Sequence, residues 1–219
     1  MSVMWHGGEK WLTPPEIRPA KKGRAEWGPG IYGTSNLDGA LKYATGNKVI
    51  QLVEFQPKTF LQQVDFGMEL VTDFVRSSVK KSVRVELLAA LERSALRCPP
   101  DLSKSKIGSG IPVSGNALLC LYVNLDLSSG AAGPALSNFF SMHGVDAFTD
   151  TAPGSSDLWT VIFNPSIITN HLVLKAADIK PSDFHLPDPR ESVSLKAAEF
   201  LNREGLHHHT NHQRTSLKM

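Results

Sequence analysis

The sequence predicts a protein of the α+β class, and three observations support this. Short apolar or β-branched segments typical of strands occur together with longer segments whose apolar residues recur at helical spacing. The strand-like and helix-like segments do not alternate regularly, as they would in a parallel α/β sheet. The chain has 219 residues, of which 41% are hydrophobic and 20% charged, a composition that suits one domain with a full core, with or without an appendage.

Charge and cysteine usage narrow the functional classes. The formal net charge of +2 is too small to indicate nucleic acid or an anionic membrane as a partner, although a nucleic-acid acceptor is not excluded. The sequence shows neither a signal peptide nor an apolar run long enough to cross a bilayer. Cys98 and Cys120 could pair, but two thiols in a chain of this length favour the reduced state. We therefore expect a cytoplasmic protein, reaching the cytoplasm of a host cell if it is an effector.

The first 55 residues predict two strands, a helix and a third strand. A strand is expected within residues 1–11, a loop over the proline-rich residues 12–29, and an extended segment at Gly30–Gly33. Ser35 is expected to cap a helix that continues through Tyr43, because its hydroxyl can accept from the amide of Asp38. Residues 48–55 are β-branched and apolar, which predicts a strand that ends before Pro57.

The middle of the chain is predicted to be helical. Apolar residues at helical spacing predict helices around residues 68–75 and 83–95, the second ending before Pro99-Pro100. Residues 101–116 are rich in Ser, Gly and Lys, which indicates a mobile loop. The apolar run 117–125 has no period that distinguishes helix from strand.

The last third predicts a helix, three strands and a terminal helix. The first helix covers 134–143 and ends at Gly144, and strands follow at 145–149, 159–163 and 171–175. A terminal helix is expected at 191–201, followed by a disordered tail over 205–219. The four histidines of this tail, His207, His208, His209 and His212, are interpreted as incidental rather than as a metal site, because no fold fixes their geometry.

Three motifs in the first 45 residues resemble the donor site of one enzyme family. They are His6-Gly7, then Gly28-Pro29-Gly30-Ile31-Tyr32, then Tyr43, which lies eleven residues after Tyr32. Their order and spacing resemble the His-Tyr branch of the ADP-ribosyltransferases, which includes the poly(ADP-ribose) polymerases and diphtheria toxin. The later pair of segments, residues 144–148 and 161–165, resembles the closing hairpin of compact phage and bacterial members.

The resemblance implies a split β-sheet core that binds NAD as co-substrate. It implies that His6 contacts a ribose hydroxyl and that the Gly7 backbone receives the carboxamide, where a glycine permits close approach. It further implies that Tyr32 and Tyr43 stack on the nicotinamide ring, with Gly30 in the Gly-x-Gly turn before Tyr32. Arg24, with Lys21 and Lys22, could neutralise the pyrophosphate, although such a cluster is more often a solvated surface.

The sequence departs from the family pattern at three positions. Gly8 and Ala40 replace two hydroxyl residues that help to hold the carboxamide. Trp159 occupies the position of the catalytic glutamate, which stabilises the developing positive charge. Asp157 is the favoured substitute because alternation along a strand puts it on the same face as Trp159, with Asp150 as the second candidate and no catalytic acid as the third.

The expected function is therefore mono-ADP-ribosylation, a glycosyltransferase reaction, of a macromolecular acceptor. That acceptor is expected to be a protein of unknown identity, which a toxin-like effector of a phage or bacterium would inactivate. Two alternatives stay open: a catalytically degenerate module of the same fold that binds a protein, and an NAD glycohydrolase. The catalytic domain is expected to span residues 1–176, with a helical insertion and loop at 66–130, and residues 177–219 form a C-terminal extension. The helical segment 66–98 within the insertion could select the partner.

Overall fold

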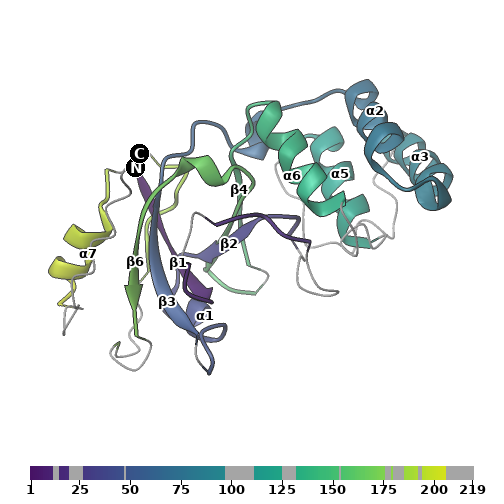
Figure 1. Ribbon diagram of the computed structural model, residues 1–219. Coiled ribbons are helices and arrows are strands. Elements are labelled where there is room, and N and C mark those ends of the chain that lie inside the picture. Colours follow the sequence, from purple (N-terminus) through teal and green to yellow (C-terminus); the bar gives the residue numbers. More distant parts are fainter. Residues whose placement is uncertain are drawn as a thin grey trace, which may run out of the picture.

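The computed structural model describes residues 1–11, 15–19, 27–46, 48–96, 111–124, 132–152, 154–175, 179, 185–191 and 194–205. Within these ranges the fold is α+β, as the sequence predicts, with a six-stranded antiparallel sheet and six α-helices (Figure 1). The strands are β1 (Ser2–Gly8), β2 (Ile31–Thr34), β3 (Val49–Phe55), β4 (Ala147–Thr151), β5 (Leu158–Ile162) and β6 (Ile168–Leu174). The helices are α1 (Leu37–Leu41), α2 (Met68–Ser78), α3 (Lys81–Leu96), α5 (Val113–Asn124), α6 (Ala132–Met142) and α7 (Ala197–Arg203), with short 3₁₀ turns at Leu61–Gln63 and Pro165–Ile167.

The sheet has the strand order β4-β5-β2-β1-β3-β6 and is weakly joined at its centre. Strand β1 pairs with β3 along its whole length, and β2 pairs with β5 at each of its residues. Between β1 and β2, in contrast, a single register pair joins Trp5 to Thr34. The sheet therefore consists of two three-stranded halves that separate beyond this pair, toward Gly8 on β1 and Ile31 on β2.

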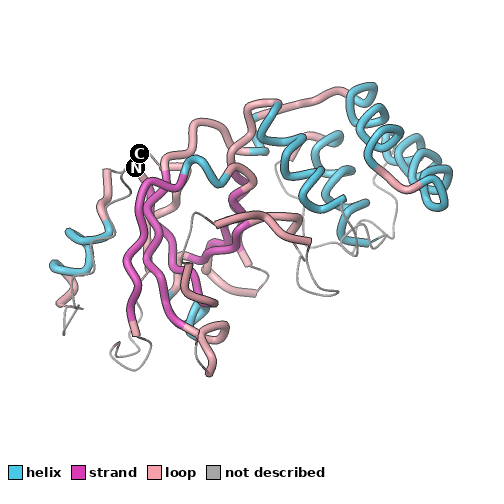
Figure 2. Tube along the Cα trace, in the orientation of Figure 1, coloured by secondary structure: helices cyan, strands magenta, loops and turns pink. Residues whose placement is uncertain are grey.

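Separate hydrophobic clusters cover the two halves of the sheet. One cluster combines Phe148 of β4 and Val161 of β5 with α2, α3, α5 and α6, which lie together at one end of the molecule (Figure 2). The other combines Trp5 and Leu52 with α1 and α7. A third, smaller cluster lies around Met4, Val53 and Ile162, on residues that alternate with those of the first two.

The described part of the C-terminal extension packs on the same sheet as the predicted catalytic domain. Leu186 and Phe200 are buried in the cluster that contains Trp5. The buried carboxylate of Glu54 on β3 accepts a hydrogen bond of 2.9 Å from the amide of Ala197, the first residue of α7. A carboxylate at this position also suits the helix dipole, so it stabilises the docked helix.

The boundaries predicted for three of the helices are wrong, beginning with α1. Asn36, not Ser35, caps α1: its side chain accepts from the amide of Asp38 at 2.9 Å, whereas the Ser35 hydroxyl accepts from the amide of Leu158. The helix ends at Leu41. Tyr43 lies in the turn that follows, and its backbone amide donates to the carbonyl oxygen of Ala40.

The other two helices with wrong boundaries are α5 and α7. Residues 113–116, expected in a mobile loop, form the first turn of α5, which also contains most of the unassigned run 117–125. The terminal helix begins at Ala197 rather than near residue 191. Residues 206–219, which contain the four histidines of the tail, lie outside the described residues, as does Cys98.

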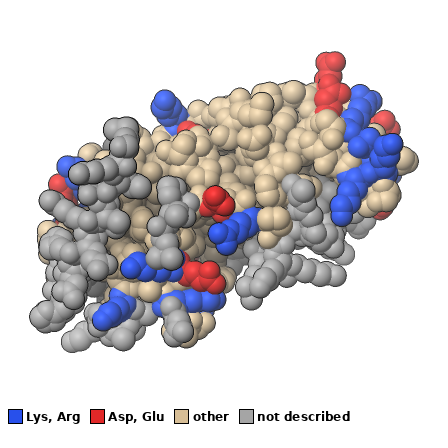
Figure 3. Space-filling model, in the orientation of Figure 1, with Lys and Arg blue, Asp and Glu red and all other residues tan. Residues whose placement is uncertain are grey.

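Charged side chains are distributed over the surface in both signs. Figure 3 shows Lys and Arg side chains gathered over the end formed by α2 and α3, with acidic side chains beside them. None of the described helices is long and apolar enough to span a membrane.

Candidate functional site

His6 lies where the two halves of the sheet separate. Its Nδ1 atom is 2.7 Å from the carbonyl oxygen of Tyr32, across the gap that β1 and β2 leave beyond Trp5 and Thr34. A carbonyl oxygen can only accept, so Nδ1 carries the proton and donates it. In the neutral ring Nε2 is then the acceptor, which suits a hydroxyl donor such as that of a ribose.

The surroundings of His6 favour this neutral form. Burial lowers the pKa of His6 below its ordinary value, the hydrogen bond to the Tyr32 carbonyl partly opposes the shift, and His171 lowers the pKa further. Near neutral pH the imidazole is therefore uncharged, with one nitrogen already bonded to the protein.

Two hydrogen bonds hold the Tyr32 ring in place. Its hydroxyl donates to the carbonyl oxygen of Gly28 at 2.6 Å and accepts from the amide of Trp27 at 3.0 Å. Gly28 has a φ of 102°, a conformation that favours glycine. A Cβ at Gly30 would lie 2.6 Å from the carbonyl oxygen of Ile162, so β2 and β5 approach closely here. The positive φ at Gly28 and the close packing at Gly30 thus account for both glycines of the Gly-Pro-Gly segment without a ligand.

Gly7 and Tyr43 are brought together by the packing of α1 on β1. A Cβ at Gly7 would lie 1.9 Å from the carbonyl oxygen of Ala40 and 3.2 Å from the Cβ of Tyr43. The Tyr43 side chain is 53% exposed, so it is not a core residue. Tyr32 and Tyr43 therefore both border the His6–Gly7 segment, Tyr32 through its carbonyl oxygen and Tyr43 through its Cβ.

Trp159 lies against Tyr43. The two ring centroids are 5.9 Å apart and the rings are nearly perpendicular, at 86°. Trp159 is paired in register with Thr34 on one side and Asp150 on the other. An indole thus occupies the position at which the family pattern has a carboxylate.

The carboxylate of Asp157 is directed to the start of α1. It accepts a hydrogen bond of 2.9 Å from the side-chain amide of Asn36 and lies 3.9 Å from Nδ1 of His185. His185 in turn forms an antiparallel bridge with Asn36. Asp157 thereby ties the C-terminal extension to α1, and the structure does not bring its carboxylate together with His6.

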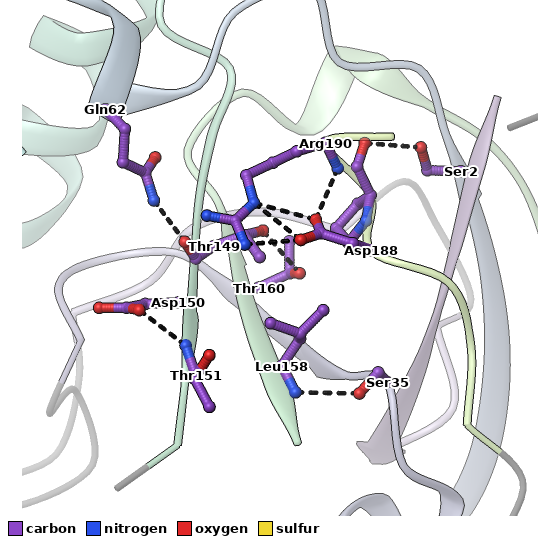
Figure 4. Close-up of polar contacts among 11 residues, drawn as sticks. Ser2, Ser35, Gln62, Thr149, Asp150, Thr151, Leu158, Thr160, Asp188 and Arg190 are labelled. Atoms are coloured by element: carbon purple, nitrogen blue, oxygen red, sulfur yellow. Dashed lines mark hydrogen bonds and ion pairs between the residues drawn. The ribbon is translucent and has the colours of Figure 1, made fainter. Parts of the chain in front are cut away.

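Asp150 lies on β4 and is paired in register with Trp159 of β5. Strand β2 lies on the other side of β5. The Asp150 carboxylate accepts from the amide of the next residue, Thr151, at 2.7 Å (Figure 4). Nearby, Arg190 of the C-terminal extension pairs with Asp188 at 2.6 Å. Hydrogen bonding to Asp188 raises the pKa of Arg190 most, and the charge of Asp150 contributes to the rise. The Asp150 carboxylate therefore interacts electrostatically with Arg190, a cation of the C-terminal extension.

Residues 144–148 and 161–165, whose sequences resemble a closing hairpin, lie side by side through the pairing of β4 with β5. The side-chain amide of Asn164 donates to the carboxylate of Asp146 at 2.9 Å, and the amides of Phe163 and Asn164 both donate to the Asp146 carbonyl oxygen. The same carboxylate accepts from the amide of Lys58 at 2.8 Å. Asp146 is buried and connects the segment after β3 to this hairpin, which is a structural role.

Sequence reasoning missed three residues beside His6. Gln51 is fully buried and lies opposite His6 in register, while Trp11 and His171 form ring contacts near it. The available signal was Gln51, an uncharged polar residue within the apolar segment 48–55, because a buried amide requires partners. Arg24, Lys21 and Lys22, the predicted pyrophosphate ligands, lie outside the described residues.

Comparison of the chain with protein-family models, with curated proteins and with solved structures gave no match. Among the residues that the structure describes, no three His, Cys, Asp or Glu side chains are grouped so that they could hold a metal ion.

Proposed function

We propose that the chain is an NAD-dependent mono-ADP-ribosyltransferase of the His-Tyr type, which transfers ADP-ribose to a macromolecular acceptor, most simply a protein. The observation that carries the proposal is the hydrogen bond from His6 to the Tyr32 carbonyl oxygen at the point where the sheet separates. It supports a donor site there because it leaves Nε2 of a neutral imidazole as an acceptor, next to the glycine backbone of β1.

In this proposal each residue has a defined task. Nε2 of His6 accepts from a ribose hydroxyl of NAD, and the Gly7 backbone bonds the carboxamide. Tyr43, exposed in the turn after α1, supplies a flat apolar surface to the nicotinamide, and Tyr32 supplies a second surface held by Gly28. The bond that breaks joins nicotinamide to the ribose, its electron pair leaves with nicotinamide, and the acceptor nucleophile forms the new bond to the ribose carbon.

The missing glutamate defines the chief alternative. A catalytically degenerate module of the same fold is favoured by the contact of Trp159 with Tyr43, because an indole cannot stabilise an oxocarbenium ion as a carboxylate does. The proposed transferase uses Asp157 or Asp150 instead, whose carboxylates accept from the Asn36 side chain and from the Thr151 amide in the structure. NAD hydrolysis, with water as acceptor, is the third outcome.

One assay separates these functions. The protein is incubated with NAD labelled on the adenylate and with a cell lysate, and label is followed on protein bands and as free ADP-ribose. A discrete labelled band is expected from the wild type and is lost in His6→Ala. Free ADP-ribose without a band would indicate hydrolysis, and the absence of both products would indicate the inactive module.

A further inference from the structure

The segment after β1 folds back over the sheet beside His6, and Gln51 holds it there. The side-chain amide of Gln51 donates to the carbonyl oxygen of Glu9 at 3.1 Å, and its oxygen accepts from the amide of Trp11 at 3.4 Å. Gln51 is fully buried on β3 directly opposite His6. Burial of an amide is costly unless both of its ends are bonded, and here both ends bond this one short segment.

The anchored segment puts the Trp11 indole against the His6 imidazole. The two ring centroids are 4.8 Å apart at an angle of 38°, and the imidazole of His171 contacts the indole at 5.3 Å. Trp11 also packs against the small cluster that contains Met4 and Val53. The indole therefore lies between two imidazoles and covers the His6 ring on the sheet surface.

We propose that Trp11, anchored by Gln51, is a positioning residue for His6. The packed indole limits rotation of the imidazole, so that Nδ1 stays on the Tyr32 carbonyl oxygen and Nε2 keeps one direction. It also shields the ring from water. The effect on His6 itself is independent of any ligand, whereas the consequence for NAD binding rests on the proposed function.

The first test reads His6 directly by NMR of protein with ¹⁵N-labelled histidine, the signals being assigned with His6→Gln. In the wild type we expect one tautomer with the proton on Nδ1 and a His6 pKa below its ordinary value, in line with the burial of the ring. In Trp11→Ala we expect both tautomers and a pKa shifted up toward 6.5, because water reaches the ring. Trp11→Phe, which keeps an aromatic cover, should resemble the wild type.

A matched control separates positioning from general loss of stability. Phe74→Ala removes an aromatic side chain from the distant helical cluster and should lower stability without changing the His6 tautomer. Gln51→Leu removes the anchor while it leaves Trp11 intact, and we expect it to shift His6 in the same direction as Trp11→Ala. If folded Trp11→Ala and Gln51→Leu both keep the wild-type tautomer and pKa of His6, the inference is wrong.

Calorimetry with NAD then tests the functional consequence. Trp11→Ala should weaken NAD binding by about tenfold, the equivalent of one aromatic contact, and Trp11→Phe should restore most of it. If the wild type does not bind NAD, the proposed function fails while the NMR result still decides the positioning role. If the wild type binds NAD and folded Trp11→Ala binds it equally well, Trp11 does not position His6 for the ligand.

Discussion

The close approach of α1 to β1 makes Gly7→Ala the most direct test of the site geometry. The added Cβ would lie 1.9 Å from the Ala40 carbonyl oxygen, whereas ordinary contact begins at 3.4 Å. The neighbour is helix backbone rather than a flexible side chain, so α1 must retreat by about the difference between these two distances. Overpacking of this kind costs about 1–3 kcal/mol. In a chain of this size each kcal/mol lowers Tm by roughly 2–4 °C.

Thermal unfolding and NAD titration measure the two consequences. Retreat of α1 also displaces Tyr43, whose Cβ would lie 3.2 Å from the new methyl group, so NAD affinity should fall together with Tm. Gly115→Ala is the matched control, because its new Cβ meets only the side chains of Ile111 and Leu61, at 3.3 Å, and alanine favours helix α5. If Gly7→Ala unfolds at the wild-type temperature, α1 does not pack on β1 in this way and the reasoning about Tyr43 fails.

Three further predictions concern single side chains. Because Tyr43 is 53% exposed, Tyr43→Ala should leave Tm nearly unchanged but weaken NAD binding by about 1–3 kcal/mol in calorimetry, and equal affinity would exclude the stacking role. If Asp157 stabilises the oxocarbenium ion, Asp157→Asn should reduce turnover by about 100-fold with little change in NAD affinity. Asp150→Asn should then have a mild effect on turnover, and the reverse pattern would assign the role to Asp150. The pKa values of His6 and His171 are both lowered in the folded state, so the unfolded chain binds more protons below pH 6.5, and stability should fall as the pH is lowered through that value. Denaturant titration should show a smaller loss in His171→Gln, and an equal loss would exclude His171 as a contributor.

Much of the fold followed from local patterns, and the failures have identifiable causes. The strand at 48–55 was visible as a continuous β-branched apolar run, and it is buried on both faces from Ile50 to Phe55. The helices around 68–75 and 83–95 were visible because their apolar residues recur at helical spacing. Helix α5 escaped assignment because it is buried on all sides: Leu118, Leu119, Leu121 and Tyr122 are all essentially inaccessible to solvent. A helix without a polar face has no amphipathic period to detect.

The candidate site likewise contains residues that a local pattern revealed and contacts that it did not. The motif around His6, Gly7 and Tyr32 was visible because its members are spaced along one short stretch of chain, and the hydrogen bond between His6 and Tyr32 joins that stretch across the sheet. Asp157 was selected by strand alternation alone. Its carboxylate instead faces Asn36 and His185, partners that are 121 and 28 residues away along the chain.

The sequence by itself determined the α+β class, the order of the elements other than α5, and the three motifs that suggest a donor site. These properties depend on apolar periodicity, turn residues and capping within a few residues of each other. Only the tertiary structure decided that the sheet is joined at one pair between Trp5 and Thr34, that Trp11 covers His6, and that Trp159 packs on Tyr43. These contacts depend on strand register and on the approach of α1 to β1. Both bring together segments that are distant in the sequence, and a local pattern does not encode such pairings.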